Sequence, residues 1–298
     1  GNRALNASGT EILAGMDGLS LLTTHREFLR EPVTTFWATS AATAQAAGMA
    51  ATIMARAPEL WPETIRALMV HSAEWTPSML RQLEGAATKK EAMLLTRQFG
   101  YGVPSLERAL NSAQNDLALV AQTEIQPFRR HRKVGEAGKT GVLGPPTLHQ
   151  IHYYELPWPK QALEQLFNEK VALKITLSYF VEPNPGQNAP VRPERYQSFG
   201  LRFDLRRKSE TPKTFKARIN QLEKGELPAL KAESDNRWTF GSKSRNAGSL
   251  HCDVWTGPAI DLVTRDTLAI YPVGGWWKTN TRLNRYNCKA RYALVVSI

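Results

Sequence analysis

Ser40 is the residue of this chain whose setting is best suited to nucleophilic chemistry. It stands near the start of residues 39–56, which read TSAATAQAAGMAATIMAR and predict a helix. At a helix N-terminus the backbone N–H groups and the helix dipole favour negative charge. A serine there can attack a carbonyl carbon while its own amide helps to hold the resulting oxyanion. The alternative interpretation is a serine that only caps a core helix.

The helix that would carry Ser40 is built mainly from small residues. Alanine, glycine, serine and threonine fill most of residues 39–56, so other parts of the backbone can approach nearly every face. We therefore expect a buried central helix over residues 40–56. Thr39 or Ser40 is expected to cap its start.

The residues after this helix predict more helical structure. Pro62 and Glu63 suit the first turn of a second helix, and residues 65, 68, 69 and 72 recur at helical spacing. Further helices are expected over residues 77–98, with Gly85 as a break, and around residues 106–110. Between them, residues 99–104 read FGYGVP, which is typical of a turn.

Three of these segments, in their order and spacing, resemble the subtilisin-like serine proteases. Residues 38–48, ATSAATAQAAG, resemble the family's nucleophile motif G-T-S-x-A-x-P-x-x-A-G, with Ser40 at the serine position. Residues 58–69 resemble the family's next helix, and residues 99–104 resemble the turn that closes its catalytic domain. The resemblance implies a serine endopeptidase in which Ser40 forms an acyl-enzyme with a polypeptide substrate.

Some positions depart from the family's pattern. Ala38 replaces the usual glycine, which would restrict the turn before Ser40 if a positive φ were required there. Ala44 and Gln45 replace a proline and its polar neighbour. We interpret these changes as bearing on the level of activity more than on family membership.

A serine hydroxyl needs a base, and a catalytic histidine needs a carboxylate to orient it. Asp17 and His25 precede Ser40 in the family's order, but the resemblance places the catalytic pair on separate elements far upstream. We interpret Asp17 as a turn residue and His25 as a surface residue. Asn2 and Asn6 lie closer to Ser40 than the resemblance implies for the oxyanion Asn. The Asp, His and Asn are therefore expected outside this chain, which should be inactive alone.

The other histidines and cysteines do not predict a second site. His71 falls beside the buried face of the second helix and is expected to be packed or half-exposed. His149, His152, His251 and Cys252 lack any recognisable metal-ligand spacing. We therefore expect no metal and no cofactor. With two cysteines the chain cannot hold a disulfide scaffold, so cysteine usage leaves the compartment open.

Beyond about residue 116 the apolar residues alternate at strand spacing. The expected strands are residues 117–123, 148–155, 171–179, 196–206, 250–256, 267–273 and 292–298, with short helices at 159–168 and 212–223. We predict the α+β class. Residues 1–116 would be the helix-rich C-terminal part of a subtilisin-like α/β catalytic domain, and residues 117–298 an antiparallel, jelly-roll-like β-sandwich.

Composition excludes several classes of protein. Hydrophobic residues make up 42% and charged residues 22%, which rules out wholesale disorder. No run of about 18 apolar residues occurs, so we expect no membrane span, and we expect no signal peptide. The net charge of +11 is concentrated after residue 117, but the basic residues are scattered. A nucleic-acid partner is therefore not expected.

Two functions remain open from the sequence. The first is a C-terminal fragment of a subtilisin-like serine endopeptidase. The alternative is a pseudoprotease or protein-binding module whose β-domain engages a protein partner. In both, the small-residue helix needs cover, either from the missing N-terminal half of the catalytic domain or from another chain. A helix left exposed in a monomer would argue against the resemblance.

Overall fold

The computed structural model describes residues 3–8, 10–14, 16–114, 118–132, 143–186, 195–224 and 236–298. It separates the chain into two compact units, Gly1–Pro58 and Glu59–Ile298. The boundary therefore follows the first long helix and does not fall at residue 116, where the composition changes. The division into domains at residues 1–116 and 117–298 stays a prediction.

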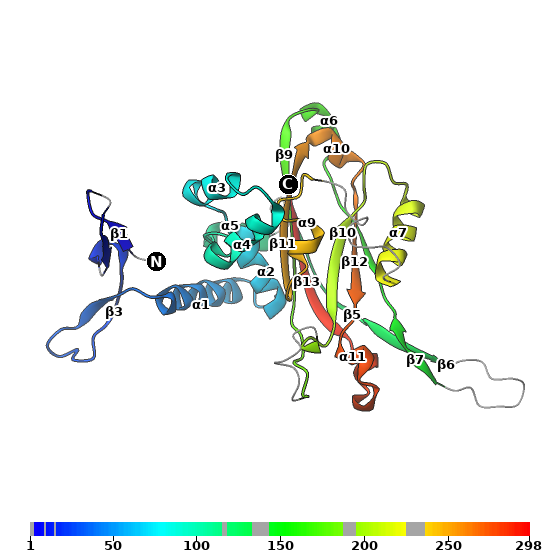
Figure 1. The fold of residues 1–298 in the computed structure, drawn as a ribbon, viewed down its shortest axis with the longest axis horizontal. Coiled ribbons are helices and arrows are strands. Elements are labelled where there is room, and N and C mark those ends of the chain that lie inside the picture. Colours follow the sequence, from blue (N-terminus) through cyan, green and yellow to red (C-terminus); the bar gives the residue numbers. More distant parts are fainter. Residues whose placement is uncertain are drawn as a thin grey trace, which may run out of the picture. The chain divides into compact units, whose positions relative to one another are not determined.

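The first unit consists of two small hairpins and a long helix (Figure 1). Its elements are β1 (Arg3–Leu5), β2 (Ile12–Ala14), the 3-10 turn η1 (Asp17–Leu19), β3 (Leu21–Thr24), β4 (Val33–Phe36) and α1 (Thr39–Arg56). β1 pairs with β2 and β3 pairs with β4, both antiparallel. Few of the residues of this unit whose burial is described are buried, so that part has little core of its own.

The second unit begins with a group of helices. They are α2 (Pro62–Ser72), α3 (Pro77–Glu84), α4 (Lys89–Phe99) and α5 (Leu106–Ala113). Pro62 occupies the first position of α2, as the sequence predicts, and Gly85 ends α3. Thr76, Thr88 and Ser105 cap α3, α4 and α5 with their side-chain oxygens.

Two antiparallel sheets follow. The first has the order β11-β9-β13-β5, formed by Leu250–Pro258, Lys170–Tyr179, Ala290–Ser297 and Ala118–Ile125. The second has the order β10-β12-β8, formed by Gly200–Leu205, Thr267–Val273 and His152–Glu155. A separate hairpin joins β6 (Phe128–Arg132) to β7 (Leu143–Leu148). The single strand expected at residues 148–155 is therefore wrong, because it combines the end of β7 with β8.

The main core draws on both sheets. Leu173, Ile175 and Leu177 of β9 belong to the same buried cluster as Phe203 of β10 and Ile270 of β12. Thr176 and Ser178 alternate with these residues, face the opposite way and bond to His71 and Arg66 of α2. The sheets are thus joined by apolar packing on one side, while polar contacts from β9 help to hold α2 on the other.

Helices lie on the outer sides of both sheets (Figure 1). α2 packs on β9 and β13 of the first sheet. α7 (Pro212–Lys224) packs on β12 through Phe215 and Ile219, which contact Ala269 and Tyr271. The shorter elements are α6 (Lys160–Leu166), α9 (Gly241–Arg245), α10 (Ala259–Val263), α11 (Trp276–Thr279), η3 (Thr281–Leu283) and η4 (Arg285–Asn287).

The mixture of helices and antiparallel sheets fits the predicted α+β class. A jelly-roll sandwich is not established by this strand order and stays a prediction. None of the helices in the described ranges has the length and apolar character that a membrane span requires.

Candidate functional site

Ser40 lies in the first turn of α1, at the second helical position. Its side chain is exposed. The residue before the helix, Ala38, offers no side-chain cap, so the first-turn amides are not satisfied by a neighbouring side chain. An exposed hydroxyl beside such amides is the arrangement that nucleophilic attack with oxyanion stabilisation requires.

The backbone conformation of Ala38 shows whether alanine can replace the family's usual glycine at this position. Ala38 has φ −165° and ψ 170°, which is extended backbone open to any residue. Alanine in place of glycine therefore brings no strain to the approach to Ser40. The capping expectation is wrong: Thr39 and Ser40 lie inside the helix, and Thr43 bonds back to the Thr39 carbonyl instead.

The expected burial of the helix over residues 40–56 is also wrong for this chain. Only Ala41 and Ile53 of α1 are buried, and Ser40 and Met54 are exposed. The physical reason is that the described residues of the first unit form two small hairpins, which cannot cover the faces of an 18-residue helix. Its small and apolar side chains are therefore left open to solvent.

Asp17 lies in a turn, as its sequence context predicts, whereas His25 is half-buried and not the exposed surface residue expected from the sequence. Asp17 opens η1 and accepts a hydrogen bond from the Thr35 hydroxyl at 3.3 Å. His25 follows β3, where its Nδ1 accepts from the Glu27 amide at 3.1 Å. A triad histidine instead donates its Nδ1–H to a carboxylate. In this structure His25 is therefore not set up as the base for Ser40.

The side chain of Asn6 forms hydrogen bonds within its own turn. Its Oδ1 accepts from the Thr10 amide at 2.9 Å and its Nδ2 donates to the Thr10 hydroxyl at 3.1 Å. The amide group is thus committed to the β1–β2 connection and does not serve as an oxyanion donor. Asn2 lies outside the described residues.

The second resembling segment forms α2, and its start is held by a residue distant in the sequence. Trp61, just before the helix, gives no side-chain cap. Gln122 of β5 accepts at Oε1 from the Trp61 amide at 2.9 Å and from the Thr64 hydroxyl at 2.8 Å. Its Nε2 donates to the Glu59 carbonyl at 3.0 Å. Sequence reasoning missed this contact because a glutamine on a strand gives no local signal of it.

The third resembling segment is a turn that requires its glycines. Gly100 and Gly102 have φ values of 58° and 106°, in the region that favours glycine. The backbone of Val103 pairs with that of Glu74 in both directions, at 3.1 and 2.8 Å. A Cβ at Gly102 would lie 2.2 Å from the Glu74 carbonyl oxygen, so any other residue would break this pairing.

His71 and Ser297 form a serine–histidine pair, and its chemistry can be judged from its surroundings. His71 Nε2 lies 2.8 Å from Ser297 Oγ, and Nδ1 lies 3.0 Å from Thr176 Oγ1. Burial, aided by the Lys174 ammonium, lowers the pKa of His71 to about 3. A general base works best with a pKa near the operating pH, and no carboxylate orients this ring. The pair is structural, in line with the packed position predicted for His71.

The other predicted histidines and Cys252 do not converge. His152 Nδ1 bonds the Tyr292 hydroxyl at 2.7 Å, and His251 Nε2 bonds the Gly248 carbonyl at 3.0 Å. Cys252 is buried and accepts from Thr176 at 3.3 Å, while His149 precedes β8. In the described ranges no three His, Cys, Asp or Glu side chains are grouped as metal ligands.

Comparison with known proteins adds one match. Residues 3–102 match the model of the subtilase family, the peptidase S8 group. This span includes Ser40, α2 and the turn at residues 99–102. We expected an exposed α1 to argue against the resemblance to the family, but the match includes this helix all the same. No curated protein and no solved structure matches the chain.

Proposed function

We propose, from the premise that residues 3–102 are a subtilase segment, that Ser40 is the nucleophile of a serine endopeptidase. The observation that carries the proposal is the position of Ser40 within that segment. Its hydroxyl is exposed in the first turn of α1, beside amides that no side chain caps. This is where acyl transfer needs both an attacking oxygen and donors for the oxyanion.

The reaction follows from these groups. Ser40 Oγ forms a bond to the scissile carbonyl carbon while its proton passes to a histidine base. The carbonyl oxygen takes the negative charge and is held by the amide of Ser40 and by an asparagine. The protonated histidine gives its proton to the leaving amine, the C–N bond breaks and an acyl-enzyme remains. Water, deprotonated by the same histidine, then releases the acid and restores Ser40.

The base, its carboxylate and the asparagine are proposed to come from outside this chain. Neither Asp17 nor His25 is arranged for these roles. Without a base the Ser40 hydroxyl is a poor nucleophile at neutral pH. The isolated chain is therefore expected to be inactive, and the parent protein to be a peptidase.

The apolar surface of the first unit supports a covering partner. Leu22 on β3 is 74% exposed, and Leu29 in the β3–β4 connection is 89% exposed. Met54 of α1 is also exposed, at 52%. Large exposed apolar side chains that gather in a patch mark interaction surfaces. We propose that this surface and α1 pack against the N-terminal half of the catalytic domain. That half would bring the catalytic His to Ser40.

Hydrolysis of casein by the full-length gene product tests the proposal. Ser40→Ala is expected to lower the rate at least about a thousandfold, because the attacking oxygen is lost. Ser78→Ala is the matched control, since Ser78 is also exposed at the second position of a helix in the same segment. It should leave the rate unchanged. An unchanged rate in Ser40→Ala would overturn the proposal and favour the protein-binding alternative.

A further inference from the structure

A cavity of about 560 Å³ lies in the second unit, between the helices and the outer face of the first sheet. Its walls come from α3, α5, the residues after α2, and strands β9, β11 and β13. Its volume lies within the range of small-molecule sites, roughly 300–1,000 Å³. No step proposed for Ser40 uses it.

One wall of the cavity is aromatic. The ring of Phe240 lies 6.2 Å from that of Trp75 and 6.4 Å from that of Tyr101, measured between centroids. Leu80 and Leu83 of α3 complete this apolar side. Such a wall binds hydrocarbon or aromatic groups by excluding water from them.

Two cationic side chains, Lys174 and Arg108, also line the cavity. Lys174 of β9 reaches the cavity and donates from Nζ to the Ala73 carbonyl at 2.6 Å. This is a neutral partner, and among the described residues no carboxylate lies within ion-pair distance of Lys174. Burial lowers the pKa of Lys174, which means that its positive charge is poorly solvated.

The acidic groups of the same cavity are already engaged. Glu74 forms an ion pair with Arg108 at 2.6 Å. Asp253 accepts from the Phe240 and Gly241 amides, each at 2.9 Å, and from Arg245 at 3.3 Å. Among the described residues that line the cavity, Arg108 is paired with Glu74, and Lys174 is the cation that no carboxylate contacts within ion-pair distance. An anion entering the cavity would therefore meet Lys174.

We propose that this cavity binds an apolar monocarboxylate. The carboxylate accepts hydrogen bonds from the Lys174 ammonium, and the hydrocarbon part lies against Trp75, Tyr101 and Phe240. An ammonium has three donors, so Lys174 can keep its bond to Ala73 and still bind the carboxylate. A neutral ligand of the same shape would lose this charge-assisted bond, and a cationic one would be repelled.

The binding of octanoate to the whole chain, measured by titration calorimetry, tests this proposal directly. We expect saturable binding of octanoate at least tenfold tighter than that of 1-octanol, and no binding of octyltrimethylammonium. Equal affinities for octanoate and octanol, or no saturable octanoate binding, would overturn the proposal. This comparison uses the unaltered protein and does not depend on any variant folding.

Variants then locate the anion within the molecule. Lys174→Met should weaken octanoate binding at least tenfold while octanol binding stays unchanged. Lys170→Met is the matched control, because Lys170 is an exposed lysine on the same strand and does not line the cavity. Equal weakening in both variants would place octanoate on the basic surface and would overturn the proposal.

Discussion

The Nε2 atom of His71 lies 2.8 Å from the hydroxyl oxygen of Ser297, so α2 is tied to the last strand of the chain. Thr176 donates to Cys252, which leaves its oxygen to accept from His71 Nδ1–H. The Ser297 hydroxyl then donates to Nε2. A neutral imidazole is thereby satisfied at both nitrogens, and α2 is bound to the sheets within one compact unit.

Buried neutral histidines make the stability of the second unit depend on pH. Burial lowers the pKa of His71 from 6.5 to about 3, and that of His251 from 6.5 to about 4. At pH values between 6.5 and these lowered pKa values, the unfolded chain binds more protons than the folded chain. The free energy of unfolding should therefore fall as pH is lowered below 6.5, by about 1.4 kcal/mol per pH unit for each histidine.

Urea unfolding between pH 5 and 7 measures this effect. His71→Gln and His251→Gln should each reduce the change of unfolding free energy with pH by the contribution of one histidine, about 1.4 kcal/mol per pH unit. His25→Gln is the control, because His25 is only partly buried in the first unit. A slope unchanged in both variants would show that these histidines do not titrate as their burial requires.

Gln122 should stabilise the start of α2 from a distance. Replacing it with alanine removes acceptors for the Trp61 amide and the Thr64 hydroxyl. We expect Gln122→Ala to lower the free energy of unfolding by about 1–2 kcal/mol. Glu124→Ala, an exposed position on the same strand, should cost less than about 1 kcal/mol. Equal losses in thermal or urea unfolding would count against this role of Gln122.

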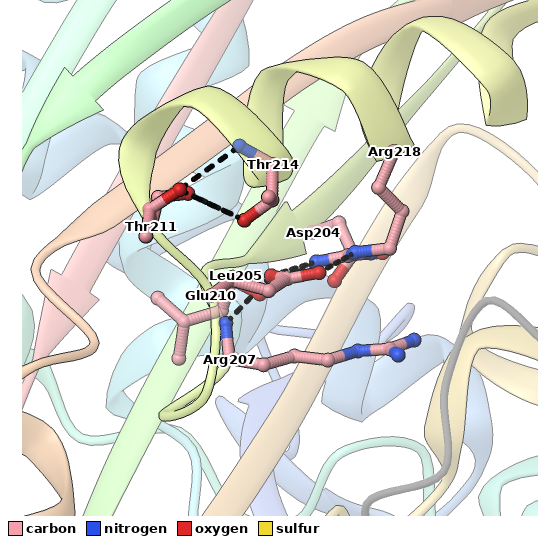
Figure 2. A network of polar contacts seen from close by, with 7 residues as sticks. All are labelled: Asp204, Leu205, Arg207, Glu210, Thr211, Thr214 and Arg218. Carbon is pink, nitrogen blue, oxygen red and sulfur yellow. Dashed lines mark hydrogen bonds and ion pairs between the residues drawn. The ribbon is translucent and has the colours of Figure 1, made fainter.

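Arg218 holds α7 against the second sheet through a buried network (Figure 2). Its guanidinium bonds Asp204 at 2.7 Å, Glu210 at 3.0 Å and the Leu205 carbonyl at 3.2 Å. Arg218→Met leaves these acceptors without their cation, so we expect a loss of about 3–5 kcal/mol in unfolding free energy. Lys213→Met, exposed on the same helix, should change it by less than about 0.5 kcal/mol. A small loss for Arg218→Met would mean that water replaces the guanidinium.

The exposure of α1 predicts rapid amide exchange. In the isolated chain the amides of α1 should exchange with deuterium far faster than those of β9, which lies in the core. In the full-length protein the proposed N-terminal half should slow the exchange of α1. Strong protection of α1 in a monomer of this chain would contradict both the exposed helix and the need for a partner.

Local signals in the sequence predict where the helices and strands lie better than they predict what packs against them. Pro62 marks the start of α2, and the alternation at residues 171–179 predicts β9. The alternation does not say what the polar residues of β9 contact, and Thr176 and Ser178 in fact bond to His71 and Arg66 of α2. These partners lie more than 100 residues apart, so no local pattern reveals them.

The same limit applies to the candidate site. The position of Ser40 in a first helical turn follows from the sequence, because small residues and helix propensity are local properties. The exposure of α1 does not, because burial depends on what packs against the helix. Its small residues predict close packing without saying which polypeptide provides it.

Mapping the site of fluorophosphonate labelling by mass spectrometry tests the central claim most directly. The reagent bonds a serine only when a base activates its hydroxyl. Ser40 should be labelled in the full-length gene product and remain unlabelled in the isolated chain under the same conditions. Labelling of Ser40 in the isolated chain, or labelling of a different serine in an active full-length protein, would contradict the account.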